Sequence, residues 1–308
     1  MADRLDEVAK KLVDLDLWGL IGPVSWAVKP AGTAFPYFCA LLKGDGRPVK
    51  VRLLLLEGWQ TVHDFNRTMA DRAFGFYSTP MEMPHFELVV LDGGGFKVVR
   101  DDPGYMPREL TLPERTLCAR VLWEVYGVLL RLESDRDLAV RYAAEKAAFS
   151  RVEDPAGEWH DRPLPIQPPR PYVEQISFPT DDIRQAKLLP LATEEAVELD
   201  FRLLPNVMTQ EPRPRCAYLL AAVDAKTGER RVWDKASVPA DGGLKGLWTS
   251  FPPRLLKHML AFGRIPGEVR VLPGRVHRML HPLITELPFK LSLHERLPRL
   301  ESALKSGV

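Results

Sequence analysis

The strongest constraint on the fold is an unbroken apolar run, Cys216–Val223, in the last third of the chain. A run without polar alternation is typical of a strand that is buried on both faces. After it come a short strand at Arg230–Trp233 and then alternating helices and strands, with strands at Val269–Leu272 and Phe289–Leu293. Such alternation predicts a layered α/β domain with parallel strands.

The N-terminal half has a different pattern, of hairpins and helices. Four apolar strands are predicted to form two hairpins: Tyr37–Leu42 with Val49–Leu56, and Phe86–Leu91 with Phe96–Val99. The triplet Gly93–Gly95 supplies the second turn, and Thr111 begins a Thr-x-x-Glu capping box ahead of a long helix to about Leu132. We therefore expect an α/β protein with an α+β N-terminal part and a layered C-terminal α/β domain.

A proline-rich segment divides these two parts. Residues 155–171 contain six prolines in seventeen positions, a density that opposes both helix and central strand and favours an extended linker. The expected organisation is a domain over residues 1–154, a connection over 155–171 and a domain over 172–308. Just before the connection, residues 141–152 fit either a helix or a strand that enters a hairpin, and we favour the strand.

Three further elements are predicted beyond the proline-rich segment. Tyr172–Phe178 has a strand pattern, and Ser250 with Pro252 is predicted to open a helix that ends at Gly263. Val276 to Leu287 repeats apolar residues at helical spacing, which predicts an amphipathic helix with Leu280 and Leu283 in the core.

Composition and charge place the chain among soluble globular proteins. It is 45% hydrophobic and 27% charged, without a signal peptide pattern or an apolar run of about 18 residues that would span a bilayer. Three cysteines lie far apart, which indicates free thiols and a reducing cytoplasm. Residues 211–308 carry 17 Lys/Arg and 9 Asp/Glu, a balance of +8, which leaves −7 for residues 1–210 of a chain whose net charge is +1. The basic part either binds a polyanion or docks on the acidic part, and we favour docking.

Both halves contain short motifs that resemble bacterial families of unknown function. Phe35–Cys39 and Pro103–Pro107, followed by the capped helix, resemble one such family. Val223–Gly228, Pro266–Val271 and His294–Pro298 are similar to a second family. The resemblance implies a bacterial source, and it brings no known activity, cofactor or catalytic residue.

Asp224 is the first candidate for chemistry. A buried strand, a hairpin with Asp224 at its turn, and then alternating helices and strands resemble the ribonuclease H-like fold. In that fold a carboxylate at the end of a strand helps to hold two Mg²⁺ ions for attack on phosphate. A second acid is expected after Val269–Leu272, but Pro273–Arg275 stands there. An Asp-x-x-Thr-Gly sequence is also ordinary turn chemistry, and we favour that interpretation.

Histidines and basic residues provide the other candidates. His277 and His281 are spaced i, i+4 on a predicted helix, so that they could share a metal ion, although Arg275 and Arg278 beside them would repel a cation. Four residues could contact a polyanion: Arg254, Lys257, Arg275 and Arg278.

The sequence therefore favours a non-catalytic binding or interaction module, with no cofactor expected. The partner is an unknown protein or a second copy of the chain, with nucleic acid as a weaker alternative and no membrane. The alternative from another class is a ribonuclease H-like, metal-dependent nuclease or nucleic-acid-binding protein, intact or degenerate.

Overall fold

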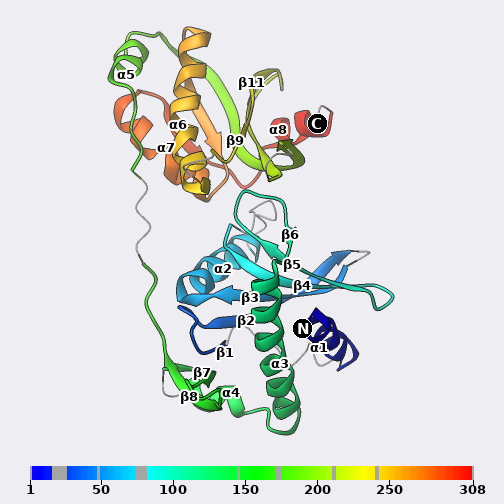
Figure 1. The fold of residues 1–308 in the computed structure, drawn as a ribbon. Coiled ribbons are helices and arrows are strands. Elements are labelled where there is room, and N and C mark those ends of the chain that lie inside the picture. The colour runs from blue at the N-terminus through cyan, green and yellow to red at the C-terminus, as the bar shows by residue number, and fades with distance from the viewer. Residues whose placement is uncertain are drawn as a thin grey trace. The chain divides into compact units, whose positions relative to one another are not determined.

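The computed structural model describes residues 2–15, 26–46, 49–73, 82–143, 146–170, 175–209, 213–239 and 243–306. The chain folds as two compact units (Figure 1). Most of residues 1–171 form unit 1, and residues 172–308 form most of unit 2. Each unit has its own sheet, so the predicted α/β class is confirmed.

Unit 1 contains an eight-stranded sheet in the order β6-β5-β4-β3-β2-β1-β7-β8. Its neighbouring strands are antiparallel except β1 and β7, which run parallel. The strands are β1 (Trp26–Lys29), β2 (Tyr37–Gly46), β3 (Val49–Glu57), β4 (His85–Leu91), β5 (Phe96–Asp101), β6 (Arg108–Glu109), β7 (Ala147–Glu153) and β8 (Trp159–Pro165). Both predicted hairpins are present, and Gly93 and Gly94 have positive φ in the second turn, a conformation that favours glycine. Strand β1 was not predicted.

Helices pack against both faces of this sheet. On one face, α1 (Ala2–Leu15) and α3 (Leu112–Ser134) bury apolar residues such as Leu5 and Val121 against Phe86 and Leu88. On the other face, α2 (Gly58–Ala73) contributes Val62 and Phe65 to a separate cluster with strand residues. The face on which α2 packs also includes His85 and Glu87, which alternate with the apolar residues of β4.

The proline-rich segment is in part an edge strand. Residues 159–165, predicted to be linker, pair with β7 in the register Phe149↔Pro163 and Ala147↔Pro165. Strand β8 lies at the edge of the sheet. A proline has no N–H to donate, and an edge strand tolerates it because no further strand needs that hydrogen bond. The ambiguous residues 141–152 fall partly in helix α4 (Leu138–Ala143) and partly in β7, so both interpretations hold for part of the segment.

Unit 2 contains a five-stranded sheet in the order β11-β10-β9-β12-β13. Its strands are β9 (Leu191–Thr209), β10 (Arg215–Asp224), β11 (Arg230–Ser237), β12 (Ile265–Val271) and β13 (Lys290–Leu293). Strands β9, β10 and β11 are antiparallel, whereas β12 is parallel to both β9 and β13. The prediction of parallel strands is therefore correct only for β12, β13 and β9, because tight hairpins reverse the chain between strands.

Four helices of unit 2 belong to the described residues: α5 (Thr180–Ala186), α6 (Gly243–Phe262), α7 (Arg275–Glu286) and α8 (Pro298–Lys305). Helices α6 and α7 bury Leu255, Leu280 and Leu283 in one cluster. Leu297, just before α8, and Leu300 within it form another cluster with alternate residues of β10. Leu280 and Leu283 are fully buried, as predicted.

Two predicted elements of unit 2 are wrong. Residues 175–178 have no strand hydrogen bonding, and residues 172–174 of that predicted strand lie outside the described part of the chain. Helix α6 begins at Gly243, so Pro252 and Pro253 lie inside it instead of at its start. The prolines leave backbone carbonyls without their usual donors, but the buried side chains of Leu247, Trp248 and Phe251 hold the helix to the core.

Candidate functional site

Asp224 shapes the turn between β10 and β11. Its Oδ1 accepts hydrogen bonds from the backbone N–H groups of Lys226 (2.9 Å) and Thr227 (2.8 Å), and its Oδ2 accepts one from Arg231 (3.2 Å). These donors, the Thr227 amide first, lower the pKa of the Asp224 carboxyl to about 2. The carboxylate is thus committed to the turn, and Gly228 follows at φ +78°.

The predicted histidine pair is present on α7. The rings of His277 and His281 lie 4.9 Å apart, nearly perpendicular to one another. Burial lowers the pKa of His277, and the neighbouring His281 and Arg278 lower it further. Within the described residues, neither histidine nor Asp224 belongs to a group of three metal-ligating side chains whose donor atoms lie within 4.8 Å of one another.

The four predicted basic residues occupy two places. Arg254 and Lys257 lie on α6 and line one groove of unit 2. Arg275, at the start of α7, places its guanidinium carbon 4.2 Å from the centre of the Trp248 ring, a cation–π contact. Arg278 is exposed on the same helix. The structure thus brings only the first two together.

This groove of unit 2 combines a large volume with polar side chains. It has a volume of about 970 Å³ and lies between helix α6, strand β11 and the chain that precedes α5. The residues that line it are Gln175, Ser177, Phe178, Pro179, Asp234, Gly246, Thr249, Ser250, Pro253, Arg254, Lys257 and His258.

Asp234 organises the charged end of this groove. Its Oδ2 lies 3.0 Å from Nη1 of Arg254 and 3.4 Å from Nε2 of His258, four residues further along α6. Lys257 is exposed, and no ion pair of Lys257 is found in the part of the chain that the structure describes. The hydroxyls of Thr249 and Ser250 donate to carbonyls of the preceding helical turn, so their remaining lone pairs can only accept. The side chains of the groove that can bind a ligand's anionic group are therefore the ammonium of Lys257 and the guanidinium of Arg254, which also pairs with Asp234.

Sequence reasoning missed Asp234 and the residues at 175–179. Asp234 lies in a strand about twenty residues before Arg254, and no local spacing links the two. Only the packing of β11 against α6 brings them together.

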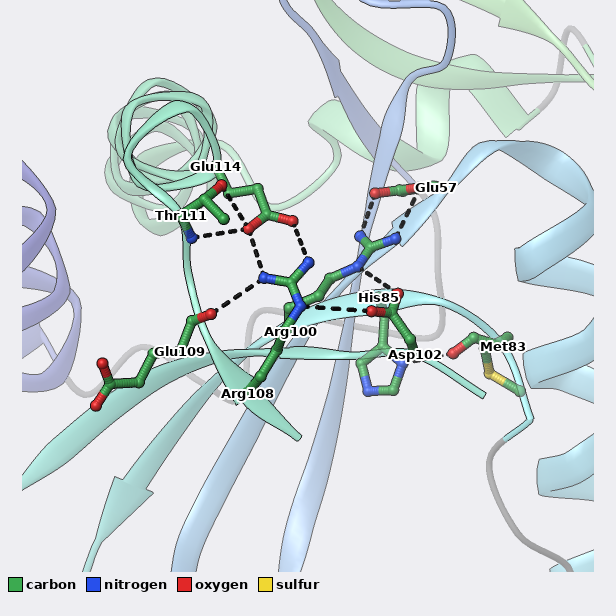
Figure 2. Close-up of polar contacts among 9 residues, drawn as sticks. All are labelled: Glu57, Met83, His85, Arg100, Asp102, Arg108, Glu109, Thr111 and Glu114. Carbon is green, nitrogen blue, oxygen red and sulfur yellow. Dashed lines mark hydrogen bonds and ion pairs between the residues drawn. The ribbon is translucent and has the colours of Figure 1, made fainter. Parts of the chain in front are cut away.

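Unit 1 contains a separate network of arginines and carboxylates, shown in Figure 2. Arg100 pairs with Glu57 and with Asp102 (2.8 Å), and Arg108 makes two contacts with Glu114 (2.6 and 2.7 Å). Arg108 and the donors of Thr111 lower the pKa of the Glu114 carboxyl to about 2. Glu114 is also the acid of the predicted capping box. Because these charges satisfy one another, the network stabilises the fold and leaves no group free for a ligand.

The comparisons with known proteins bear on unit 2. Residues 182–306 match the model of a family described as a domain of unknown function (DUF6930), and no model covers the N-terminal half. The match agrees with the resemblance of the C-terminal motifs to a family of unknown function. No curated protein matches the chain. None of the described helices has the length and hydrophobicity that a bilayer crossing requires.

Proposed function

We propose that unit 2 is a non-catalytic binding module that takes the anionic group of a ligand in the groove over α6. The observation that carries this proposal is the placement of Arg254 and Lys257 in one groove with Asp234 as the acidic residue among its lining. The Asp234 carboxylate orients the guanidinium of Arg254 and leaves the exposed ammonium of Lys257 for the ligand.

The size and chemistry of the groove support this proposal. Binding sites for small molecules usually enclose about 300–1,000 Å³, which covers the groove's volume of about 970 Å³. Arginine pairs with phosphate or carboxylate through a planar fork, and lysine supplies a point charge. Phosphate is the anion we favour, because its two negative charges can pair with both the guanidinium of Arg254 and the ammonium of Lys257.

The test is binding of inorganic triphosphate, and of a fluorescein-labelled single-stranded oligonucleotide, to the full chain. We expect Lys257→Glu to weaken the binding of both probes about tenfold or more at low salt, because an attractive charge becomes a repulsive one. Isothermal titration calorimetry measures the first probe and fluorescence anisotropy the second.

Lys305→Glu is the matched control. It makes the same change of charge on α8 of the same unit, at an exposed residue that does not line the groove. Equal weakening by the two variants would show attraction to the unit's general charge and would contradict a site in the groove, as would no binding of either probe.

The alternative function is a ribonuclease H-like nuclease or nucleic-acid-binding protein. It is favoured by the order of elements in unit 2, where three antiparallel strands are followed by helices that alternate with the parallel strands β12 and β13. The first acid of such a site would be Asp224, whose hydrogen bonds in the turn oppose this role.

The setting that we propose is a bacterial cytoplasm, for a chain that divides into two domains near residue 171 and whose N-terminal domain comes from a family of unknown function. The cytoplasmic part of this proposal is supported by the three cysteines, which form no disulfide among the described residues; Cys39 and Cys118 are buried and Cys216 is partly buried. The partner of this binding module is a protein, a second copy of the chain or a nucleic acid, and the oligonucleotide titration separates the last from the others.

A further inference from the structure

Three potential metal ligands meet on one face of the sheet of unit 1. His85 begins β4 and lies opposite Asp101, the last residue of β5. Glu87 is two residues beyond His85, so its side chain points to the same face. The donor atoms of these three side chains all lie within 4.8 Å of one another. Adjacent strand ends thus bring together an imidazole and two carboxylates.

The hydrogen bond of His85 fixes which ring nitrogen is free. Nδ1 lies 2.8 Å from the backbone carbonyl of Met83, an acceptor, so Nδ1 carries the proton and donates it. Figure 2 shows the His85 ring beside Met83. Nε2 then holds a lone pair, and this buried atom has no hydrogen-bond partner among the described residues. The whole side chain is 0% exposed.

An unpartnered buried nitrogen points to a ligand. Buried polar atoms nearly always have a partner, and leaving one without a partner costs free energy. Histidines that bind metal usually donate their second ring N–H to a carbonyl or carboxylate, which orients the lone pair toward the ion. The contact with Met83 is of this kind, and Nε2 lies 3.9 Å from Oε2 of Glu87.

The carboxylates also carry more negative charge than their surroundings balance. Glu87 is 1% exposed and pairs with Arg52, which contacts both of its oxygens, one at 2.9 Å. Asp101 adds a second carboxylate, with an oxygen that lies within 4.8 Å of an oxygen of Glu87. A divalent cation would compensate this charge, although Arg52 lowers the attraction. Asp101 is only partly buried, which gives an ion access.

We propose that His85, Glu87 and Asp101 bind one divalent transition-metal ion, for which Zn²⁺ is the best match. Mixed imidazole and carboxylate ligands suit Zn²⁺ better than Mg²⁺, which prefers oxygen donors. A tetrahedral ion at 2.0–2.1 Å from each donor needs donors about 3.3 Å apart. The side chains would therefore close by up to about 1.5 Å from the 4.8 Å limit, and a water molecule would complete the coordination. Two arrangements compete with a bound metal ion. One is a direct contact between His85 and Glu87, whose atoms lie 3.9 Å apart, and the other is a water molecule that bridges the three side chains.

The experiment uses the full chain with His277→Ala and His281→Ala, because that surface pair could bind Zn²⁺ by itself. After treatment with a chelator, Zn²⁺ is added in a calorimetric titration and in a thermal unfolding series. We expect one equivalent to bind and the melting temperature to rise by several degrees, since an ion that binds only the folded state stabilises it. Mg²⁺ at the same concentration should leave the melting temperature unchanged.

Asp101→Asn is the decisive variant, because its partly exposed position makes loss of folding less of a risk than at the buried His85. It should weaken Zn²⁺ binding about 100-fold or more by removing a charged ligand, with its circular dichroism spectrum unchanged. Substitution by Co²⁺ gives a second readout, a visible absorption band that should be present in the parent and lost in Asp101→Asn.

His160→Ala is the matched control. His160 belongs to the other group of acids and histidine, with Asp154 and Glu158, where Asp154 already accepts hydrogen bonds from two backbone amides and from His160. This variant should keep full Zn²⁺ affinity. Absence of Zn²⁺ binding, equal stabilisation by Mg²⁺, or undiminished binding in Asp101→Asn would each overturn the proposal.

Discussion

At the residue scale, substitution of Asp224 tests whether its carboxylate shapes a turn or binds a metal ion. Asp224→Asn keeps an oxygen that accepts from the amides of Lys226 and Thr227 and loses the charge that faces Arg231. We expect the free energy of unfolding to fall by less than about 1 kcal/mol at neutral pH. Chemical denaturation measures this change, and Asp224→Ala, which removes the acceptor, should cost more.

The effect of Asp224→Asn on the free energy of unfolding should depend on pH. The pKa of Asp224 is lowered from 3.8 to about 2 in the folded protein. The carboxylate therefore stabilises the fold above pH 3.8, and this contribution is lost as the pH falls toward 2. The difference in unfolding free energy between the parent and Asp224→Asn should narrow over that interval.

Metal addition tests the nuclease alternative at this residue. If Asp224 shapes only the turn, then Mn²⁺ should change the melting temperature of the parent and of Asp224→Asn by the same amount, because Asp224 belongs to no group of three metal-ligating side chains among the described residues. A rise with Mn²⁺ that depends on Asp224 would favour the nuclease over the binding module.

At the scale of elements, helix α7 is a case in which the spacing of apolar residues was sufficient to predict the buried face. Its apolar spacing predicted that Leu280 and Leu283 are buried, and both are fully buried. Leu283→Ala should lower the free energy of unfolding by about 2–5 kcal/mol, because it removes buried methyl groups and leaves a cavity. His281→Ala, on the exposed side of the helix, should change it by less than about 0.5 kcal/mol. Equal effects in urea denaturation would contradict this packing.

Other elements form only because of the strands and side chains against which they pack. Six prolines in residues 155–171 oppose a central strand, yet β8 forms because an edge strand pairs on one side only. Helix α6 continues through Pro252 and Pro253 because its buried side chains outweigh the lost hydrogen bonds. Local propensity is a weak preference that such tertiary packing can override.

At the scale of the whole molecule, the two units suggest where the chain is first cleaved. Residues 159–165 are paired with β7, whereas Ile166 and Gln167 are exposed and outside any strand. Brief treatment with proteinase K should therefore cut first near the Ile166–Gln167 bond and leave two resistant fragments. Mass spectrometry identifies the fragments, and a first cut inside residues 147–165 would show that the β7–β8 hairpin opens readily.

The candidate sites show what the sequence determined and what required the tertiary structure. Residue patterns over short spans determined the α/β class, both N-terminal hairpins, the Asp224 turn and the amphipathic α7, because each depends on neighbours within a few positions. The groove over α6 joins Asp234 to Arg254, and the proposed metal site joins His85 to Asp101 across a strand pair. The residues of these two sites are not spaced in any pattern that the sequence reveals, because strand register and helix packing alone decide which distant side chains meet.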